Sequence, residues 1–211
     1  MQNMEKKQLS AEWHNERIGR FTGSQISKLL GIKGLGLTGQ TYAFDKASEL
    51  VFGRDEENES FESWDIKRGI DLEPVAFRKF AELKEVDFID VQKCSFFAYE
   101  NNAGASPDGL VGNNAVLEIK CPRSPKFFNL VAKGYDAIDK EYIAQMQMEM
   151  LVTNSHQAHF FNYIIYNNVE MWHEIIVLRD EAMIDLIKAR IIEAVVIRDN
   201  FIIELNKNKQ F

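Results

Sequence analysis

Apolar residues recur at intervals of three and four positions in several segments, which is the spacing of a helix that buries one face. These segments are TYAFDKASELVFG, EPVAFRKFAELK, YIAQMQMEMLVT and a long amphipathic stretch from Asp180 to about Leu205. In EPVAFRKFAELK, Pro74 fits the first helical turn, because the N–H that proline lacks has no partner there. Glu73 would then begin the helix, where a carboxylate favours the helix dipole.

Two shorter helices are expected nearer the start of the chain. Ser10 can cap one that carries Arg17, and Thr22 or Ser24 lies near the cap of another over TGSQISKLLG. The glycine-rich GIKGLGLTGQ that follows lacks the GxxxxGK[ST] order and follows no strand. We therefore interpret it as a loop that does not cradle phosphate.

Short runs of branched and aromatic residues predict strands. The runs are VDFIDV, CSFFAYE, AGASPDGLVG and AVLEIKCP, followed after a helix by AHFFNYIIYN and VEMWHEIIVL. Asn113-Asn114 and Asn167-Asn168 are typical of the tight turns that join antiparallel strands. Helices, a strand meander, a helix, two strands and a helix predict an α+β or mixed α/β fold, with a central sheet flanked by helices. The length of 211 residues suits a single domain over residues 1–211.

A charged pair interrupts the apolar run AVLEIKCP. Residues two apart in a strand share a face, so Glu118 and Lys120 point one way and their apolar neighbours point the other. Asp108 lies one hairpin away, in SPDG. Two carboxylates that converge at one end of a sheet suit a hard cation such as Mg²⁺, to which the carbonyl of Ile119 can add a ligand. Strand spacing alone equally allows a solvated pair beside a turn-forming aspartate.

The composition is that of a globular protein, with 45% hydrophobic and 27% charged residues. No apolar run has the length of a membrane span, and the first residues lack the apolar core of a secretory signal. Cys94 and Cys121 form no CxxC motif, which favours a reducing, cytoplasmic location. The formal net charge of −7 argues against nonspecific coating of nucleic acid. It still allows an enzyme that meets DNA through a local basic patch.

Five motifs occur together and in order: RIGRFTGS, RGIDLEP, SPDG, LEIKCP and YIAQMQ. The combination closely resembles the phage lambda exonuclease family, the YqaJ-type viral recombinases of the PD-(D/E)XK nuclease superfamily, from about Trp13 to Thr153. The resemblance implies a restriction-endonuclease-like mixed sheet. It also implies a Mg²⁺-dependent 5′→3′ exonuclease that degrades one strand of linear duplex DNA and leaves a 3′ overhang for recombination by strand annealing. The location implied is the cytosol of a bacterium or a phage-infected host.

The resemblance also assigns roles to the residues that match the family's motifs. Asp108 and Glu118 resemble the metal-binding acids of two Mg²⁺ ions, for which Mn²⁺ can substitute, and Glu73 completes the acidic cluster. Lys120 resembles the lysine that orients or activates the attacking water. Gln145 resembles the family's helical glutamine; Gln147, two residues on, cannot share its face.

A second group of residues resembles the pocket that grips a terminal 5′-phosphate. Arg17, Ser24 and Ser106 supply a guanidinium and two hydroxyls, which are good phosphate ligands. Holding the end phosphate would fix the scissile bond one nucleotide inside. Arg20 is a rival for the role of Arg17, and Ser24 can equally be a plain helix cap.

Family members act as ring-shaped trimers that thread DNA and pass the overhang to a single-strand annealing protein, and we expect the same here. Two alternatives remain: a structure- or sequence-specific endonuclease of the same superfamily, and a noncatalytic DNA-binding protein with a degenerate site. The iron–sulfur branch of the exonucleases is excluded, because two cysteines cannot supply a four-thiolate cluster.

Overall fold

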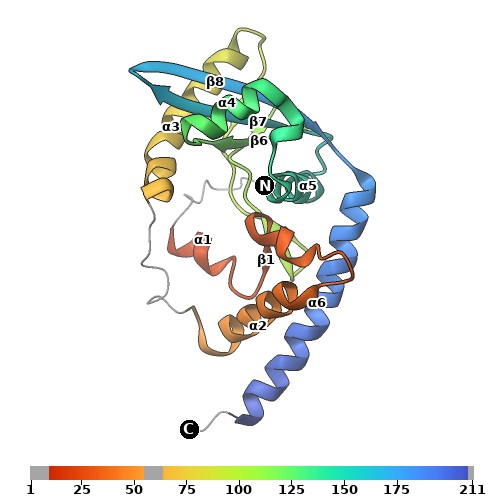
Figure 1. Ribbon diagram of the computed structural model, residues 1–211. Coiled ribbons are helices and arrows are strands. Elements are labelled where there is room, and N and C mark those ends of the chain that lie inside the picture. The colour runs from red at the N-terminus through yellow and green to blue at the C-terminus, as the bar shows by residue number, and fades with distance from the viewer. Residues whose placement is uncertain (1–9, 55–63, 209–211) are drawn as a thin grey trace.

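The computed structural model describes residues 10–54 and 64–208. It contains two β-sheets, which lie toward different parts of an elongated molecule (Figure 1). The larger sheet has the strand order β2-β5-β6-β7-β8, and the smaller has the order β1-β4-β3. The strands are β1 (Phe21–Thr22), β2 (Val91–Gln92), β3 (Phe97–Tyr99), β4 (Ala103–Ala105), β5 (Gly109–Val111), β6 (Ala115–Lys120), β7 (Gln157–Tyr166) and β8 (Val169–Leu178).

Helices cover both sheets and join them. Figure 1 places α3 and α4 beside the larger sheet, α2 and the length of α6 in the lower part of the molecule, and α5 between the two regions. The helices are α1 (Ala11–Asn15), α2 (Gly36–Phe52), α3 (Trp64–Glu85), α4 (Ser124–Lys133), α5 (Lys140–Thr153) and α6 (Glu181–Asn208), with 3₁₀ helices η1 (Gly23–Leu29) and η3 (Gly134–Ala137). The predicted mixed fold with a central sheet and flanking helices is confirmed.

Strand β6 lies at the centre of the larger sheet and carries side chains into two cores. It pairs antiparallel with β5 and parallel with β7, so both of its edges are hydrogen-bonded. Leu117 packs with Phe80 and Phe161 on the side covered by α3. Val116 packs with Met146 on the side covered by α5. Burying a side chain of this size stabilises the fold by about 1.5–3 kcal/mol, so β6 is a firmly held platform for the charged residues at its end.

The smaller sheet brings the start of the chain beside the segment that precedes β5. Strand β1 runs parallel to β4, with Phe21 opposite Ala103 and Thr22 opposite Gly104. Phe21 is fully buried in a core to which η1, α2, α5 and α6 all contribute. The two segments remain in close contact at the ends of these strands. A Cβ added at Gly23, directly after β1, would lie 2.9 Å from the Cβ of Ala105, the last residue of β4.

The hairpin of β7 and β8 has the predicted Asn-Asn turn. Asn167 and Asn168 have φ angles of 50° and 62°. Two successive positive φ angles are the requirement of a type I′ hairpin turn, in which asparagine is favoured. The Asn113-Asn114 turn between β5 and β6 is likewise present.

Helix α3 differs from the prediction in where it begins. It starts at Trp64, so Pro74 lies inside the helix and not in its first turn. Glu73 is consequently in the middle of a helix of 22 residues, and the helix dipole does not account for it. The sequence-based boundary depended on Pro74, which is typical of a first helical turn but here lies inside the helix.

Other boundaries were also predicted wrongly. The segment AGASPDGLVG forms two strands that belong to different sheets, and most of VDFIDV is the turn that follows α3, with only its last residue in β2. Helix α1 ends at Asn15, capped by Ser10 as predicted, so Arg17 lies in the turn that follows. The segment after Thr22 is 3₁₀ and not α-helical, and α4 was not predicted.

Candidate active site

The charged pair at the end of β6 is buried and not solvated. The ammonium of Lys120 lies 2.5 Å from Oε1 of Glu118. The Glu118 side chain is only 2% exposed, and that of Lys120 is 28% exposed. A buried carboxylate is costly unless it is paired or binds a cation, which removes the alternative of a solvated surface pair.

Asp108 lies against the same end of β6. Its backbone N–H donates to the carbonyl of Leu117 at 2.9 Å, and its Oδ2 accepts a hydrogen bond from the N–H of Ile119 at 2.6 Å. The N–H and C=O of one strand residue point to the same edge, so the carbonyl of Ile119 also points toward the Asp108 side. The structure therefore brings together Asp108, Glu118 and the Ile119 backbone, as the sequence predicted.

Helix α5 adds two polar side chains to this cluster. The amide nitrogen of Gln145 donates to Oε1 of Glu118 at 2.7 Å and to Oε1 of Glu149 at 2.9 Å. Both glutamates are 1% exposed. One amide group thus bridges two buried carboxyl groups, one on the sheet and one on the helix.

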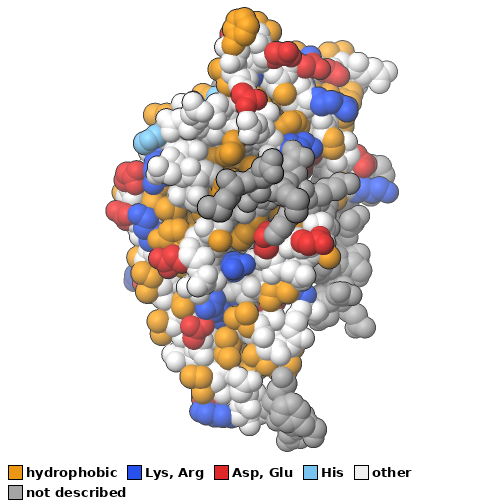
Figure 2. Space-filling view, turned by 180° about the vertical axis from the view of Figure 1, so that it is seen from behind, with side chains coloured by type: hydrophobic (Ala, Val, Ile, Leu, Met, Phe, Trp, Pro, Cys, Tyr) orange, Lys and Arg blue, Asp and Glu red, His pale blue; other side chains and the backbone are white. Residues whose placement is uncertain are grey.

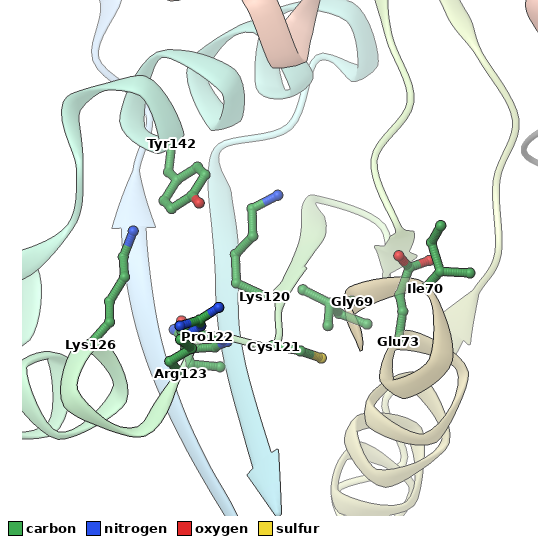
Figure 3. A pocket seen from close by; sticks show the side chains of 11 residues that line it. Gly69, Ile70, Glu73, Lys120, Cys121, Pro122, Arg123, Lys126 and Tyr142 are labelled. Atoms are coloured by element: carbon green, nitrogen blue, oxygen red, sulfur yellow. The ribbon is translucent and has the colours of Figure 1, made fainter. Parts of the chain in front are cut away.

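Glu73 faces the cluster from α3 across a cavity of about 580 Å³. Figure 3 shows Glu73 and Lys120 on opposite sides of this cavity, with Tyr142 above Lys120. The ammonium groups of Lys120 and Lys126 lie 4.8 and 4.6 Å from the centre of the Tyr142 ring. The cavity is lined by Gly69, Ile70, Glu73, Ile119, Lys120, Cys121, Pro122, Arg123, Lys126, Tyr142 and Asn162.

Three acidic groups of the site have raised pKa values. Burial raises the pKa of Asp108 well above its usual range, and repulsion from Glu118 and Glu73 adds to this. The pKa values of Glu73 and Glu149 are raised for the same two reasons, burial first and the charge of Glu118 second. Burial alone would lower the pKa of Lys120, but Glu118 and Asp108 outweigh it, and the pKa is raised. Lys120 is therefore held as an ammonium ion.

The donor set fits a hard divalent cation. Oε2 of Glu118 and Oε2 of Glu149 are buried and have no hydrogen-bond partner. Carboxylate oxygens are the ligands that Mg²⁺ prefers, and a cation would relieve the repulsion that raises these pKa values. Within residues 10–54 and 64–208, no three His, Cys, Asp or Glu side chains are already gathered as a metal cluster. Glu118 is instead paired with Lys120.

The three residues predicted to grip a phosphate lie around the adjoining ends of β1 and β4. The indole N–H of Trp13 donates to Oγ of Ser106 at 3.0 Å, and the Arg17 guanidinium lies 4.0 Å from the centre of the Trp13 ring. Ser24 lies near Ser106, because their chain neighbours Gly23 and Ala105 are in contact. Ser24 is exposed. Burial lowers the pKa of Arg17 to about 10, which leaves it charged at neutral pH.

Arg20 has different surroundings. Its guanidinium donates to the carbonyl of Glu16 and lies 5.9 Å from the centre of the Phe96 ring. Of the two arginines, Arg17 is the one that the structure brings to Ser106 through Trp13.

Comparison with known proteins identifies the family. Residues 12–156 match the family described as the YqaJ-like viral recombinase domain. The chain belongs to this family. The membership that the five sequence motifs predicted is thus confirmed. A comparison with curated proteins found no match.

Solved structures share the fold of this YqaJ-like chain. An alkaline exonuclease (LHK-Exo) from Laribacter hongkongensis is 24% identical, with a TM-score of 0.80 over 94% of this chain and 97% of that chain. A phage-related exonuclease from Haemophilus somnus 129PT is 19% identical, with a TM-score of 0.68 over 91% of this chain and 99% of that chain.

Helix α5 carries one residue of the site that the YqaJ motifs predicted and one that they missed. Gln145 lies in the site, whereas Gln147 is buried elsewhere and bonds the Leu178 carbonyl at 2.8 Å. Glu149 was not predicted. The sequence signal that could have identified Glu149 is its position four residues after Gln145 in a helix rich in apolar residues. Residues four apart lie on the same face of a helix, so Glu149 faces the site together with Gln145.

Proposed function

We propose that this YqaJ-like protein is a metal-dependent exonuclease that degrades one strand of linear duplex DNA in the 5′→3′ direction and leaves a 3′ overhang. The observation that carries the proposal is the buried convergence of Asp108, Glu118 and Lys120 at the end of β6, beside an open cavity. The alternative of a noncatalytic DNA-binding protein is disfavoured, because buried acids that repel one another cost stability and serve no packing role.

Two Mg²⁺ ions, or Mn²⁺ in their place, would be held by Asp108, Glu118 and the carbonyl of Ile119, with Glu73 assisting. When bound, such ions activate a water molecule and offset the charge of a phosphodiester. The unpartnered oxygen of Glu118 and the raised pKa values of Asp108 and Glu73 support this assignment.

Lys120, Gln145 and Tyr142 would orient other groups of the site. Lys120 holds its proton, so its ammonium would position the water and the phosphate oxygen by hydrogen bonding and charge. Gln145 fixes Oε1 of Glu118 and thereby directs the other oxygen of this carboxylate. The ring of Tyr142, which lies against the ammonium groups of Lys120 and Lys126, limits the movement of both.

Arg17, Ser24 and Ser106 would bind the terminal 5′-phosphate and so select DNA ends. A charged guanidinium that is partly removed from water, together with hydroxyl groups, forms strong bonds to phosphate oxygens. The fixed separation between this pocket and the end of β6 would set the position of the cleaved bond. End selection is what distinguishes this proposal from a structure- or sequence-specific endonuclease.

The proposal includes the assembly and partners of the family. A homotrimeric ring would enclose the duplex, and a single-strand annealing protein would receive the 3′ overhang, in the cytosol of a bacterium or phage-infected host. Figure 2 shows a face on which basic side chains are interspersed with acidic and hydrophobic ones. Among the described residues that this view shows, the basic side chains form no continuous stripe of the kind that follows a DNA backbone. Among the helices of the described residues, none is long and apolar enough to cross a membrane.

The test is Mg²⁺-dependent digestion of two matched substrates, a linear duplex with 5′-phosphates and the same DNA as a covalently closed circle. We expect mononucleotides from the linear duplex and an intact circle, because digestion requires an end. Cleavage of the circle would favour the endonuclease alternative. Absence of cleavage of either substrate with Mg²⁺ or Mn²⁺ would favour the noncatalytic one.

A further inference from the structure

The peptide of Gly19 is held from both sides by charged side chains of two helices. Its N–H donates to Oε2 of Glu49 on α2 at 2.9 Å, and its carbonyl accepts from Nη1 of Arg198 on α6 at 2.9 Å. The φ angle of Gly19 is +68°, and a Cβ there would lie 2.4 Å from Cγ of Leu50. Only glycine fits this turn, and both of its backbone groups have a fixed partner.

Arg198 contacts a second segment of the chain with its other nitrogens. Nη2 donates to Oδ1 of Asn102 at 2.9 Å, and Nε donates to Asp199 at 2.8 Å. The side chain is 8% exposed. The backbone carbonyl of Asn102 also accepts a hydrogen bond from the N–H of Phe21 at 2.9 Å. Arg198 therefore joins α6 to the residues just before β1 and to the residue just before β4.

These two segments carry the three residues of the proposed phosphate grip. Arg17 precedes Gly19 by two positions, Ser24 follows β1, and Ser106 follows β4. Since β1 and β4 pair in parallel, fixing the residues before both strands fixes the register in which Ser24 and Ser106 emerge. The N–H of Thr22 is also bonded to the hydroxyl of Tyr42 on α2 at 2.9 Å.

A buried arginine is an expensive way to join helices, because replacement of buried ion pairs by apolar residues often leaves stability unchanged or higher. What the planar guanidinium adds is direction, since its several donors have a rigid geometry that a lysine cannot reproduce. The bonds of both terminal nitrogens of Arg198 end on the segments that hold the grip, whereas the bond of Nε to Asp199 stays on α6.

We propose that Arg198 is a positioning residue for recognition of the 5′-phosphate: with Glu49, it clamps Gly19 and Asn102 so that Arg17, Ser24 and Ser106 keep one fixed arrangement. This inference depends on the proposed end-selective nuclease activity. Arg198 acts through the backbone that it holds and does not touch the DNA.

The test compares Arg198→Lys with Arg190→Lys, the same change on the same helix, where Arg190 bonds only Glu193 in the described contacts. kcat/KM is measured on linear duplexes with 5′-phosphoryl and 5′-hydroxyl ends. In Arg198→Lys, the preference for the phosphoryl end should fall about ten-fold, chiefly through KM, because small misplacements of binding groups are costly. Arg190→Lys should keep the wild-type preference.

The outcomes separate the two proposals. A folded Arg198→Lys protein with the wild-type preference, or with equal losses on both ends, would overturn the clamp and leave the end grip in place. A wild-type protein that does not distinguish the two ends would overturn the grip itself and the clamp with it. If Arg198→Lys does not fold, Asn102→Ala removes one acceptor of Arg198 at a partly exposed position, and the same fall in preference is expected.

Discussion

At the scale of single residues, the two-residue period of a strand predicted that Glu118 and Lys120 share a face of β6. The period alone equally allowed a solvated pair, and it was the resemblance of the motifs that joined Asp108 to the same strand end, where the structure places it. Helical spacing alone could not decide between Gln145 and Gln147, because it does not say which face of the helix meets the sheet; the match to the family's motif selected Gln145. Glu149 was missed because its neighbours in α5 are apolar, and its place in the site depends on Gln145, which bonds both Glu149 and Glu118 of β6.

The first prediction at this scale concerns Glu149. Burial raises its pKa above the usual value, so the folded protein binds a proton that the unfolded chain releases above about pH 4.5. This contribution to stability is present below that pH and is lost as pH rises toward the raised pKa. We therefore expect Glu149→Gln to raise the free energy of unfolding of the metal-free protein at pH 8, with a smaller effect at pH 4.

Urea unfolding in the presence of a chelator measures this effect. Glu141→Gln is the matched control, since Glu141 is an exposed residue of the same helix. A Glu149→Gln protein that is less stable than wild type at pH 8 would contradict the account, because it would show that the carboxyl group is favourable where it lies.

A second prediction concerns Lys120. Its raised pKa means that activity should not depend on loss of its proton across the neutral range. We expect Lys120→Ala to lower kcat by at least about a hundred-fold, while Lys120→Arg, which keeps the charge, retains more activity than alanine. If alanine and arginine variants have wild-type kcat on 5′-phosphorylated duplex, Lys120 is not part of the catalytic site.

At the scale of elements, the sequence predicted long helices with periodic apolar residues well. It did not predict the short strands that form only by pairing with strands distant in sequence. The amphipathic segments became α2, α5 and α6, and the Asn-Asn turn became the β7–β8 hairpin. Strand β1 has two residues and carries no period, and its existence depends on β4, which is 80 residues away. The division of AGASPDGLVG between two sheets likewise follows from pairing with distant strands, which local pattern does not contain.

Helix α3 gives the prediction at this scale. Pro74 is exposed in its interior and cannot donate to the carbonyl four residues earlier. Pro74→Ala restores this donor, and we expect a rise of about 1–3 kcal/mol in the free energy of unfolding. Glu82→Ala, at another exposed position of α3, is the control and should change stability little. A loss of stability in Pro74→Ala would show that the packing of α3 requires the proline.

At the scale of the whole molecule, the sequence predicted the family and fold from five motifs, but it could not show how the two sheets are joined. Helix α5 lies between them, and α6 reaches from the end of β8 to the region of α2 (Figure 1). The segment between β4 and β5 also joins the two sheets directly, and it carries Ser106 of the proposed phosphate grip two residues before Asp108 of the active-site cluster. A rigid connection of this kind is what a fixed cleavage position requires.

The surface of the monomer favours association. Strand β8 is at the edge of the larger sheet, and its Trp172, Ile176 and Leu178 side chains are exposed. An apolar sheet edge is a common site of contact between copies of a chain. We expect a solution mass of three times 24.4 kDa by light scattering. A mass of one or two copies, with or without duplex DNA, would contradict the proposed ring.

The central claim is that Asp108 and Glu118 bind one divalent cation between them. Calorimetric titration with Mn²⁺ tests it most directly, on wild type, Asp108→Asn, Glu118→Gln and the exposed control Glu141→Gln. The account predicts that wild type and Glu141→Gln bind Mn²⁺ alike, and that each of the other two variants binds at least about ten-fold more weakly while still folded. Wild-type affinity in Asp108→Asn or Glu118→Gln would contradict it.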